Sequence, residues 1–250
     1  MSAPEPAGTV RMVSVSPLYL AGGGDPAWVT VPLHRACGWS HGTDPLLPRV
    51  LLSSPDQKAM LRLEPKADGP WWTIQHARTA DQPAWYASFG ARTPVEIVAA
   101  FTDALTSPCR PAVAPDPFEP LRKAGWQAPA DDAFVSPDGL VRVDRTDSWA
   151  IRTAPSPIAP AFWRADLSGN TPAHLVTLLT SALSSNTAVV RAPAQVPHLA
   201  RARMNLTTPD IPAEALASAL EDRVRALASH RAAHAAPARP HPSAGHGRTR

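Results

Sequence analysis

Hydrophobic and polar residues alternate strictly in several short segments of the chain. Residues 141–144 read Val, Arg, Val, Asp, and residues 149–152 read Trp, Ala, Ile, Arg. Residues 163–167 repeat the pattern, with Trp163, Ala165 and Leu167 on one face. A period of two residues predicts strands with one apolar and one polar face. Such strands form an antiparallel sheet that is covered on one side only.

A period of about four residues predicts the helices that cover this sheet. Apolar positions recur at that spacing in two segments: Ile97, Phe101, Leu105 and later Leu175, Leu179, Leu183. Thr93-Pro94-Val95-Glu96 predicts a capping box with Pro at the first helical position. A further amphipathic helix is expected at residues 211–230, after a short strand at residues 188–191. Its apolar stripe is Leu216, Leu220, Val224 and Leu227, and Glu221 is predicted to pair with Arg225 four residues later.

The chain contains a tandem repeat, because residues 25–105 can be written above residues 116–183 with matching motifs. Ser54-Pro55-Asp56 corresponds to Ser136-Pro137-Asp138, and Trp72-Thr73-Ile74 corresponds to Trp149-Ala150-Ile151. Many further matches follow in the same order, and they are turn, cap and core residues. An internal duplication of one structural unit explains this order.

Each unit is predicted to contain a helix, four strands and a second helix. Asp25-Pro26 and Asp116-Pro117 are helix starts, Gly38 and Gly125 are helix ends, and the Ser-Pro-Asp motifs are turns. The predicted fold is α+β, with two tandem αββββα units whose antiparallel sheets are each covered by a helix and pack as a pseudo-symmetric pair. The predicted divisions are a flexible N-terminus at 1–9, repeat units at 10–108 and 116–190, a proline-containing connector at 191–210, the amphipathic helix at 211–230 and a disordered basic tail at 231–250.

Composition narrows the class of protein. The chain has 30 prolines in 250 residues, but many of them fall at the repeated helix starts and turns. The formal net charge of +3 comes from the last quarter, because residues 1–190 carry more acids than bases. Two cysteines cannot form a disulfide framework, and neither a secretory signal nor an apolar stretch long enough for a membrane span is present. We expect a cytoplasmic protein without a membrane partner.

No constellation of residues points to catalysis. His34-x-x-Cys37-x-x-x-His41 has metal-like spacing, but the second unit does not repeat it, and a buried cysteine packed as a small apolar residue is the favoured interpretation. Gly22-Gly23-Gly24 before Asp25 lacks the rest of a phosphate loop, and a flexible connector is expected. Cys109 has no histidine nearby in the sequence. The sequence therefore predicts no enzyme, no catalytic residue, no metal and no cofactor.

The polar faces of the two predicted sheets are the candidate binding surface. The candidate residues are Arg62, Trp71, Thr73, Gln75 and Tyr86 in the first unit and Arg142, Arg152 and Arg164 in the second. Aromatic and arginine side chains on an open sheet can stack on the bases of single-stranded nucleic acid. The interspersed acids Asp144 and Asp166 weigh against a phosphate-binding surface, and the faces could instead pack on each other or remain solvated. We expect a non-enzymatic binding or interaction module whose ligand the sequence does not identify, either a protein or single-stranded nucleic acid, with a single-stranded nucleic-acid-binding protein as the alternative function.

The repeated motifs resemble those of the SPDY family, domain of unknown function 317, in two tandem copies. The resemblance rests on Gly-Trp at 38–39 and 125–126, the Ser-Pro-Asp turns, and Thr-Pro at 93–94 and 171–172. The residue after Ser-Pro-Asp is Gln57 or Gly139 rather than the tyrosine of the family motif. The family is typical of Streptomyces and related actinobacteria, so the resemblance implies such a source. It implies no activity, cofactor or catalytic residue.

Overall fold

The computed structural model describes residues 8–43, 48–66, 69–108, 111, 113–156 and 158–235. The fold is α+β, as predicted, and its largest element is one antiparallel sheet of ten strands. Its strands in chain order are β3 (Ser40–Thr43), β4 (Val50–Ser53), β5 (Ala59–Leu63), β6 (Pro70–His76), β7 (Trp85–Gly90), β8 (Gln127–Ala130), β9 (Ala133–Val135), β10 (Val141–Arg145), β11 (Ser148–Thr153) and β12 (Trp163–Ser168).

The remaining elements form a helical layer and two small sheets. The α-helices are α1 (Ala27–Arg35), α2 (Val95–Thr106), α3 (Glu119–Lys123), α4 (Ala173–Leu183) and α5 (Ala213–Ala235). The small sheets use β1 (Thr9–Arg11), β2 (Val13–Ser16), β13 (Val189–Arg191), β14 (Asn205–Thr207) and β15 (Asp210–Pro212). Short 3₁₀-helices are η1 (Leu18–Leu20), η2 (Pro193–Gln195) and η3 (His198–Arg203).

The ten-stranded sheet corrects two details of the prediction. Its strand order is β3-β4-β5-β6-β7-β12-β11-β10-β9-β8, so each unit contributes five strands rather than four. The sequence analysis missed β3 and β8 because both are edge strands without apolar alternation. The units also share one sheet instead of forming two, since β7 pairs with β12 and places Phe89 opposite Ala165. This pairing satisfies the backbone edge that each unit would otherwise expose.

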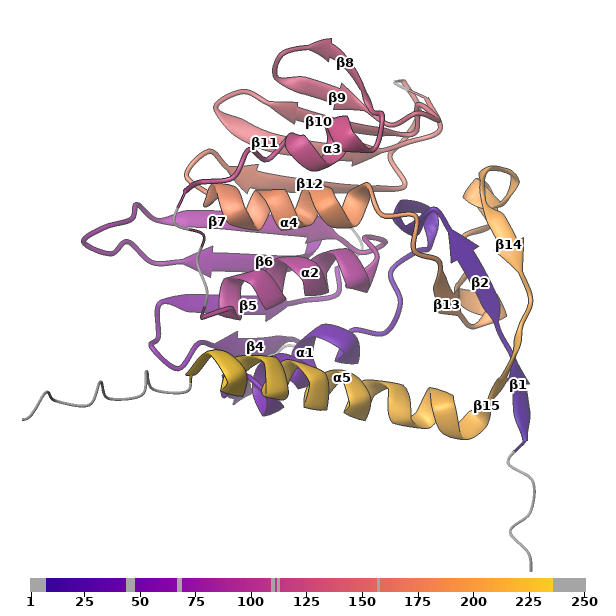
Figure 1. Cartoon of the computed structure of the whole chain (residues 1–250), viewed down its shortest axis with the longest axis horizontal. Helices are drawn as coiled ribbons and strands as arrows, with labels where there is room; N and C mark the ends of the chain where they lie inside the picture. Colours follow the sequence, from indigo (N-terminus) through magenta and orange to yellow (C-terminus); the bar gives the residue numbers. More distant parts are fainter. Residues whose placement is uncertain are drawn as a thin grey trace, which may run out of the picture.

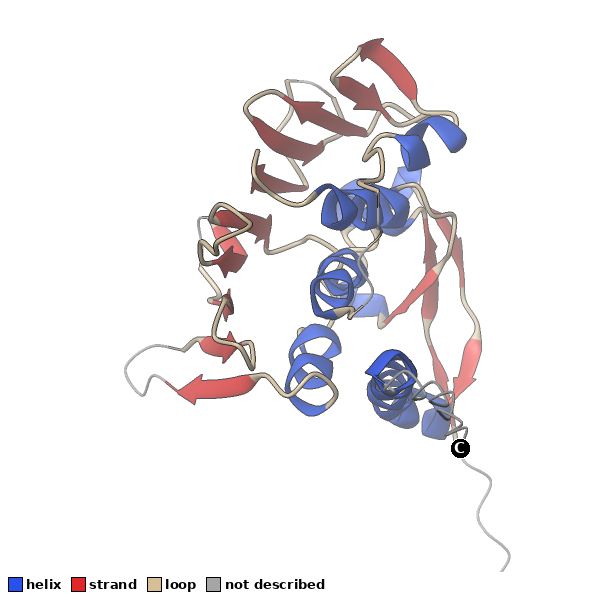
Figure 2. Ribbon diagram, turned by 60° about the vertical axis from the view of Figure 1, so that its left-hand side comes forward, coloured by secondary structure: helices blue, strands red, loops and turns tan. Residues whose placement is uncertain are grey.

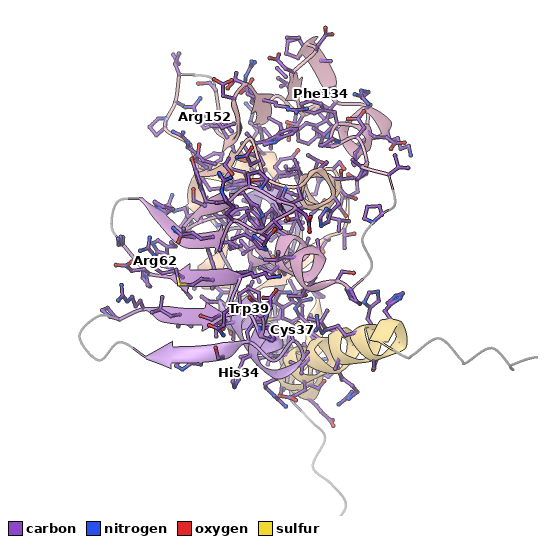
Figure 3. All side chains as sticks on the ribbon, turned by 90° about the vertical axis from the view of Figure 1, so that its left-hand side faces the viewer. His34, Cys37, Trp39, Arg62, Phe134 and Arg152 are labelled. Atoms are coloured by element: carbon purple, nitrogen blue, oxygen red, sulfur yellow. The ribbon has the colours of Figure 1, made fainter. Side chains whose placement is uncertain are left out.

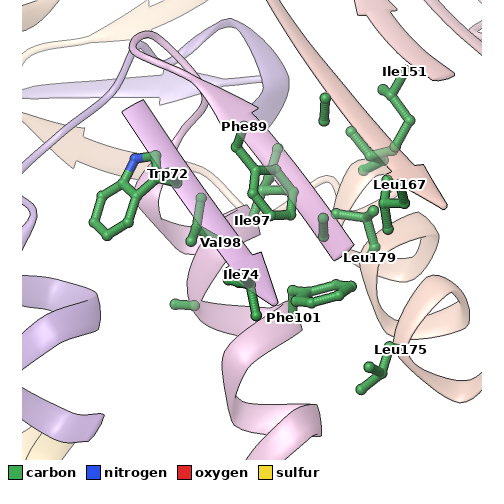
Figure 4. Close-up of a cluster of buried hydrophobic side chains, with 14 of the residues drawn as sticks. Trp72, Ile74, Phe89, Ile97, Val98, Phe101, Ile151, Leu167, Leu175 and Leu179 are labelled. Carbon is green, nitrogen blue, oxygen red and sulfur yellow. The ribbon is translucent and has the colours of Figure 1, made fainter. Parts of the chain in front are cut away.

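All the helices lie on one side of the large sheet (Figures 1 and 2). Their order across the layer is α3, α4, α2, α1, α5, with α2 and α4 in contact at the centre. Figure 4 shows Trp72, Phe89 and Phe101 of the first unit in one apolar cluster with Leu167 and Leu179 of the second. The predicted helical stripes face this core, and the two halves of the molecule share it.

The two chain segments outside the repeats are joined in the small sheets. Strand β2 precedes the aligned repeat at residues 25–105 and lies between β13 and β14, which both follow the aligned repeat at residues 116–183. Strand β1 pairs in the same way with β15. The predicted connector at 191–210 is therefore a structured part of the protein, and it contains β14 and two 3₁₀-helices. The small sheet lies beyond the helices, on the side opposite the large sheet (Figure 2).

The repeated turns and caps have the same geometry in both units. Asp25 and Asp116 each accept a hydrogen bond from the backbone N–H two residues later, at 2.9 Å. Gly38 and Gly125 end the first helices with φ of 70° and 75°, a region that favours glycine. These local predictions are confirmed.

Two local predictions are wrong, the capping box of α2 and the flexible connector before α1. Thr93 makes no capping hydrogen bond, and Glu96 binds Arg191 instead of the helix start. Gly22–Gly24 is a packed segment, not a flexible connector: Val95 donates its N–H to the Gly23 carbonyl, and a Cβ on Gly23 would lie 2.7 Å from the carbonyl oxygen of Ala91. No pattern in the sequence predicted that the backbone of Ala91 and Gln195 would pack against these glycines.

Helix α5 packs against α1 and covers the outer end of the first unit. It is longer than predicted and extends to Ala235, while residues 236–250 of the predicted tail lie outside the described residues, as do residues 1–7. Glu221 binds Arg35 of α1, and Arg225 binds Asp222, so the predicted Glu221–Arg225 pair is wrong. Because α5 packs on α1, the Glu221 carboxylate lies next to Arg35 and binds it instead of Arg225.

Candidate functional site

The side of the ten-stranded sheet that faces away from the helices is the candidate site, called here the open face. Figure 3 labels Arg62 on β5 of the first unit and Arg152 on β11 of the second. The strand registers place the predicted residues in rows that cross the strands. Arg142, Arg152 and Arg164 are direct neighbours on β10, β11 and β12. The corresponding neighbours on β5, β6 and β7 are Arg62 beside Thr73 and Gln75 beside Tyr86. Alternation predicted that these residues share one face, and the strand register makes them neighbours.

The open face is charged but nearly balanced. Arg142 binds Asp144 at 2.7 Å and Arg164 binds Asp166 at 2.6 Å, each along its own strand. Arg62 lies 3.6 Å from Glu64 in the first unit. The hydrogen bond that Arg164 donates to Asp166 also raises the pKa of the Arg164 guanidinium. The acids that the sequence showed between the arginines therefore bind those arginines.

Aromatic character on the open face is concentrated at Tyr86. Tyr86 is 47% exposed, Gln75 lies beside it on β6, and Met60 lies beside Gln75 on β5. Trp71 contributes less than expected, because it is partly buried and its indole N–H donates to the Lys66 carbonyl at 2.8 Å. Tyr86 also marks the junction of the units, since its backbone N–H donates to the Ser168 hydroxyl at 3.1 Å.

Two adjoining hollows lie at the end of the first unit, and sequence reasoning missed both. One has a volume of about 550 Å³ and lies between the strand ends of the first unit and the start of α4. Asp56, His76, Asn170 and His174 are among its lining residues. The other, of about 490 Å³, is lined by Trp85 and reaches Tyr86 and Met60. Lys58 and His76 line both.

Tyr19 was also missed as a site residue. It belongs to the lead-in at residues 15–22, which resembles that of the SPDY family, but it precedes the aligned repeats, so no internal match marked it. The residue is buried, and its hydroxyl donates to the Asp138 carboxylate of the second unit at 2.6 Å. Burial and this hydrogen bond raise the pKa of the Tyr19 phenol well above its usual value of about 10. The backbone carbonyl of Tyr19 accepts a hydrogen bond from Trp163 Nε1 at 2.8 Å. A single lead-in residue thus contacts the turn and the tryptophan of one repeat.

The His34–Cys37–His41 spacing does not become a cluster. His34 Nδ1 contacts the Trp39 carbonyl at 2.8 Å, Cys37 is buried, and His41 is exposed on the edge strand β3. Burial raises the pKa of the Cys37 thiol, so the thiol packs as a neutral group. Within the described part of the chain, no three His, Cys, Asp or Glu residues are placed to hold a metal ion. Cys109 lies outside the described residues.

Comparison with known families agrees with the duplicated architecture. The sequence profile of SPDY, domain of unknown function (DUF317), matches residues 53–111 and again residues 121–189. The chain belongs to this family. The two matches cover just over half of the chain and fall on the two repeat units, so the tandem SPDY copies predicted from the motifs are confirmed.

Other comparisons add no function. No curated protein and no solved structure matches the chain. Among the described residues, no helix is both long enough and apolar enough to cross a bilayer.

Proposed function

We propose that this tandem SPDY protein is a non-catalytic binding module that contacts its partner through the open face. One observation carries the proposal: every helix of the described residues lies on the other side of the ten-stranded sheet, and none of these residues forms an element that covers the open face (Figure 2). The exposed Tyr86 and Met60 lie on it near the junction of the two units. Exposed aromatic and methionine side chains are enriched in protein interfaces.

The charge pattern favours a protein as the partner. Arg142 and Arg164 are bound to acids on the same face, and phosphate binding to them would have to displace Asp144 and Asp166. A surface with both signs of charge instead complements another mixed protein surface. The apolar residues near the junction would form the centre of the contact, and the ion pairs its rim.

Single-stranded nucleic acid is the second candidate, and the row Arg142–Arg152–Arg164 supports it. These three guanidinium groups project from neighbouring strands, with an exposed tyrosine on the same sheet. The row continues on β7 at Gly90, four residues from Tyr86, so a strand that turns from the row along β7 would stack a base on Tyr86 and place phosphates near the arginines.

Site-specific photo-crosslinking distinguishes these proposals. A photoreactive phenylalanine analogue at position 86 is expected to capture a protein partner in cells that produce the chain. The same analogue at position 178 is the control, because Leu178 is 46% exposed but lies on α4, away from the open face. An adduct destroyed by nuclease would support the nucleic-acid candidate, and equal adducts from both positions would contradict a role for the open face.

Salt titration of a labelled single-stranded oligonucleotide provides the quantitative arm. If the bases stack on the open face, Tyr86→Ala weakens binding, and a chain ending at residue 235, which keeps every described helix and strand, still binds. If the affinity depends steeply on salt and disappears in this shortened chain, residues beyond 235 bind the oligonucleotide electrostatically.

A further inference from the structure

The two repeat units differ in what contacts their matching turn and tryptophan. In the second unit these residues are Asp138 and Trp163, and Tyr19 binds both, through its hydroxyl and its carbonyl. Asp56 and Trp85 are their counterparts in the repeat alignment. The structure supports this correspondence, because His76 pairs with Trp85 as Thr153 pairs with Trp163 in the sheet register.

The first unit presents the same groups without the tyrosine. The Asp56 turn is built like its counterpart: the Ser54 hydroxyl donates to Asp56 at 2.6 Å, and Ser136 donates to Asp138 at 2.5 Å. The Asp56 side chain is 58% exposed, and its nearest cation, Lys58, is 3.9 Å away. Trp85 is only 3% exposed and its indole nitrogen is closed to solvent, yet among the described residues its N–H has no hydrogen-bond partner. A buried donor without an acceptor is costly, so this one needs a partner.

The space beside these groups can hold a ligand. Asp56 lines the hollow of about 550 Å³ and Trp85 lines the adjoining hollow of about 490 Å³. His76 lies between them, lines both, and stacks on Trp85 with ring centroids 5.4 Å apart. These volumes fall within the range of ordinary small-ligand sites.

The surroundings of the occupied and open positions also correspond. Tyr19 and Leu20 lie beside Arg92 and Trp163, near the start of α2. In the hollows of the first unit the matching positions are Asn170, near the start of α4, and Trp85. The pseudo-symmetry therefore relates the filled position in the second unit to the hollows in the first.

We propose that these hollows form a docking site for a tyrosine-bearing peptide segment of a partner protein. The tyrosine hydroxyl donates to Asp56. A backbone carbonyl of the segment accepts the Trp85 indole N–H, as Tyr19 does at Trp163, after the segment displaces the side chains that close the indole nitrogen to solvent. The proposal rests in part on the open face, because Tyr86 and Met60 line the second hollow. Its test reads Asp56 and Trp85 instead, so it can fail while crosslinking from position 86 succeeds.

The test is a titration of the full chain with the blocked peptide acetyl-Pro-Leu-Tyr-Leu-Ala-amide, which has the sequence of residues 17–21. Nitrogen-15 labelling of the tryptophans reports the indole N–H groups, and Trp85→Phe assigns the resonance of Trp85. We expect that resonance to move downfield on binding while that of Trp163 stays in place. An unmoved Trp85 resonance, or movement of Trp163 alone, would overturn the proposal.

Asp56→Asn supplies a second readout that preserves the turn, since the amide oxygen can still accept from Ser54. Loss of a charge-assisted hydrogen bond should weaken peptide binding about tenfold. A peptide with phenylalanine in place of tyrosine should lose a similar factor. Asp138→Asn is the matched control and should change the affinity less than about twofold. Affinity that depends on Asp138 and not on Asp56 would show that the peptide only displaces Tyr19, and would overturn the proposal.

Sedimentation of the chain alone tests another occupant, the Tyr19 segment of a second copy. We expect the same sedimentation for the wild type and Tyr19→Phe. A dimer that is present in the wild type and lost in Tyr19→Phe would identify the occupant as this chain itself, against the proposal of a separate partner.

Discussion

The two repeat units have the same scaffold but different neighbours. Both have five strands, helix ends at left-handed glycines and Ser-Asp turns of the same geometry. The first unit receives α5 on its first helix, whereas Tyr19 binds the second unit. The open face also differs, with Tyr86 in the first unit and the Arg–Asp pairs in the second. Duplication preserved what backbone conformation and core packing require, and the units diverged where other segments or solvent meet them.

The largest expected effect concerns Arg191, which attaches the lead-in and C-terminal segments to the first unit. Its side chain is 5% exposed, binds Glu96 at 2.6 Å and donates to the carbonyls of Ala21 and Gly22. Arg191→Ala would leave these groups unpaired and should cost about 3–5 kcal/mol of unfolding free energy, measured in urea. The second unit has His174 at the position of Glu96, so no matching substitution exists there.

Arg142→Ala is the control for this prediction, because it breaks an exposed pair on the open face and should cost less than about 1 kcal/mol. If both variants lost equal stability, the buried network around Arg191 would not anchor the outer segments.

Tyr19→Phe tests the contact that distinguishes the second unit. Removing the hydrogen bond to Asp138 should lower the unfolding free energy by about 1.5–3 kcal/mol near pH 7. The pH dependence has a definite sign, because the pKa of folded Tyr19 is raised above the unfolded value of about 10. As the pH rises above about 10 the unfolded chain loses the tyrosine proton and the folded protein retains it, so stability falls.

Thermal unfolding between pH 9 and 11 measures this slope. The wild type should lose stability more steeply than Tyr19→Phe, which lacks the titrating group. Parallel curves would contradict the assignment, because the second tyrosine, Tyr86, is present in both proteins.

The turns after the Ser-Pro-Asp motifs permit a reciprocal exchange between the units. Gln57 has φ of 57° and its counterpart Gly139 has φ of 73°. Gly139→Ala should cost about 1 kcal/mol through the backbone alone, since a Cβ there would meet no atom within 4 Å. Gln57→Gly should be neutral or slightly stabilising, because relief of strain offsets the entropy of a freer unfolded chain.

Denaturant midpoints of the two variants measure the difference. A destabilised Gln57→Gly would show that the Gln57 side chain, which donates to the Ser54 carbonyl at 3.0 Å, outweighs the strained backbone. The two turns would then differ in energy as well as in sequence.

The smallest expected effect on folding concerns Cys37, which is present in the first unit only. The thiol is buried, and the pKa is raised mainly by that burial, with Arg231 of α5 acting in the opposite direction. A maleimide should react slowly with the full chain and at least tenfold faster with a chain ending at residue 209, because α5 covers this end. Cys109→Ser in both chains isolates the signal. Equal rates would contradict protection of Cys37 by α5.

Local patterns in the sequence predicted most of the scaffold. Alternation placed Arg142, Arg152 and Arg164 on one face, and the strand register made them neighbours. The same patterns missed β3 and β8, whose residues are mostly exposed, because an edge strand without an apolar face has no period to detect. They also missed the hollows of the first unit, which residues from β5, β6 and α4 line together.

The sequence by itself determined the elements whose cause is local. The first helix of each unit begins after an Asp-Pro pair, and it ends at a glycine with a left-handed backbone conformation. Alternating apolar and polar residues place one face of each strand in the core and the other on the open face. Only the tertiary structure decided which partners these elements found. The joining of β7 to β12, the ion pair of Arg191 with Glu96, and the contact of Tyr19 with Asp138 link residues 78, 95 and 119 positions apart. Such contacts depend on the shape of the assembled units and on buried groups that need partners. No short segment of the sequence predicts either of these.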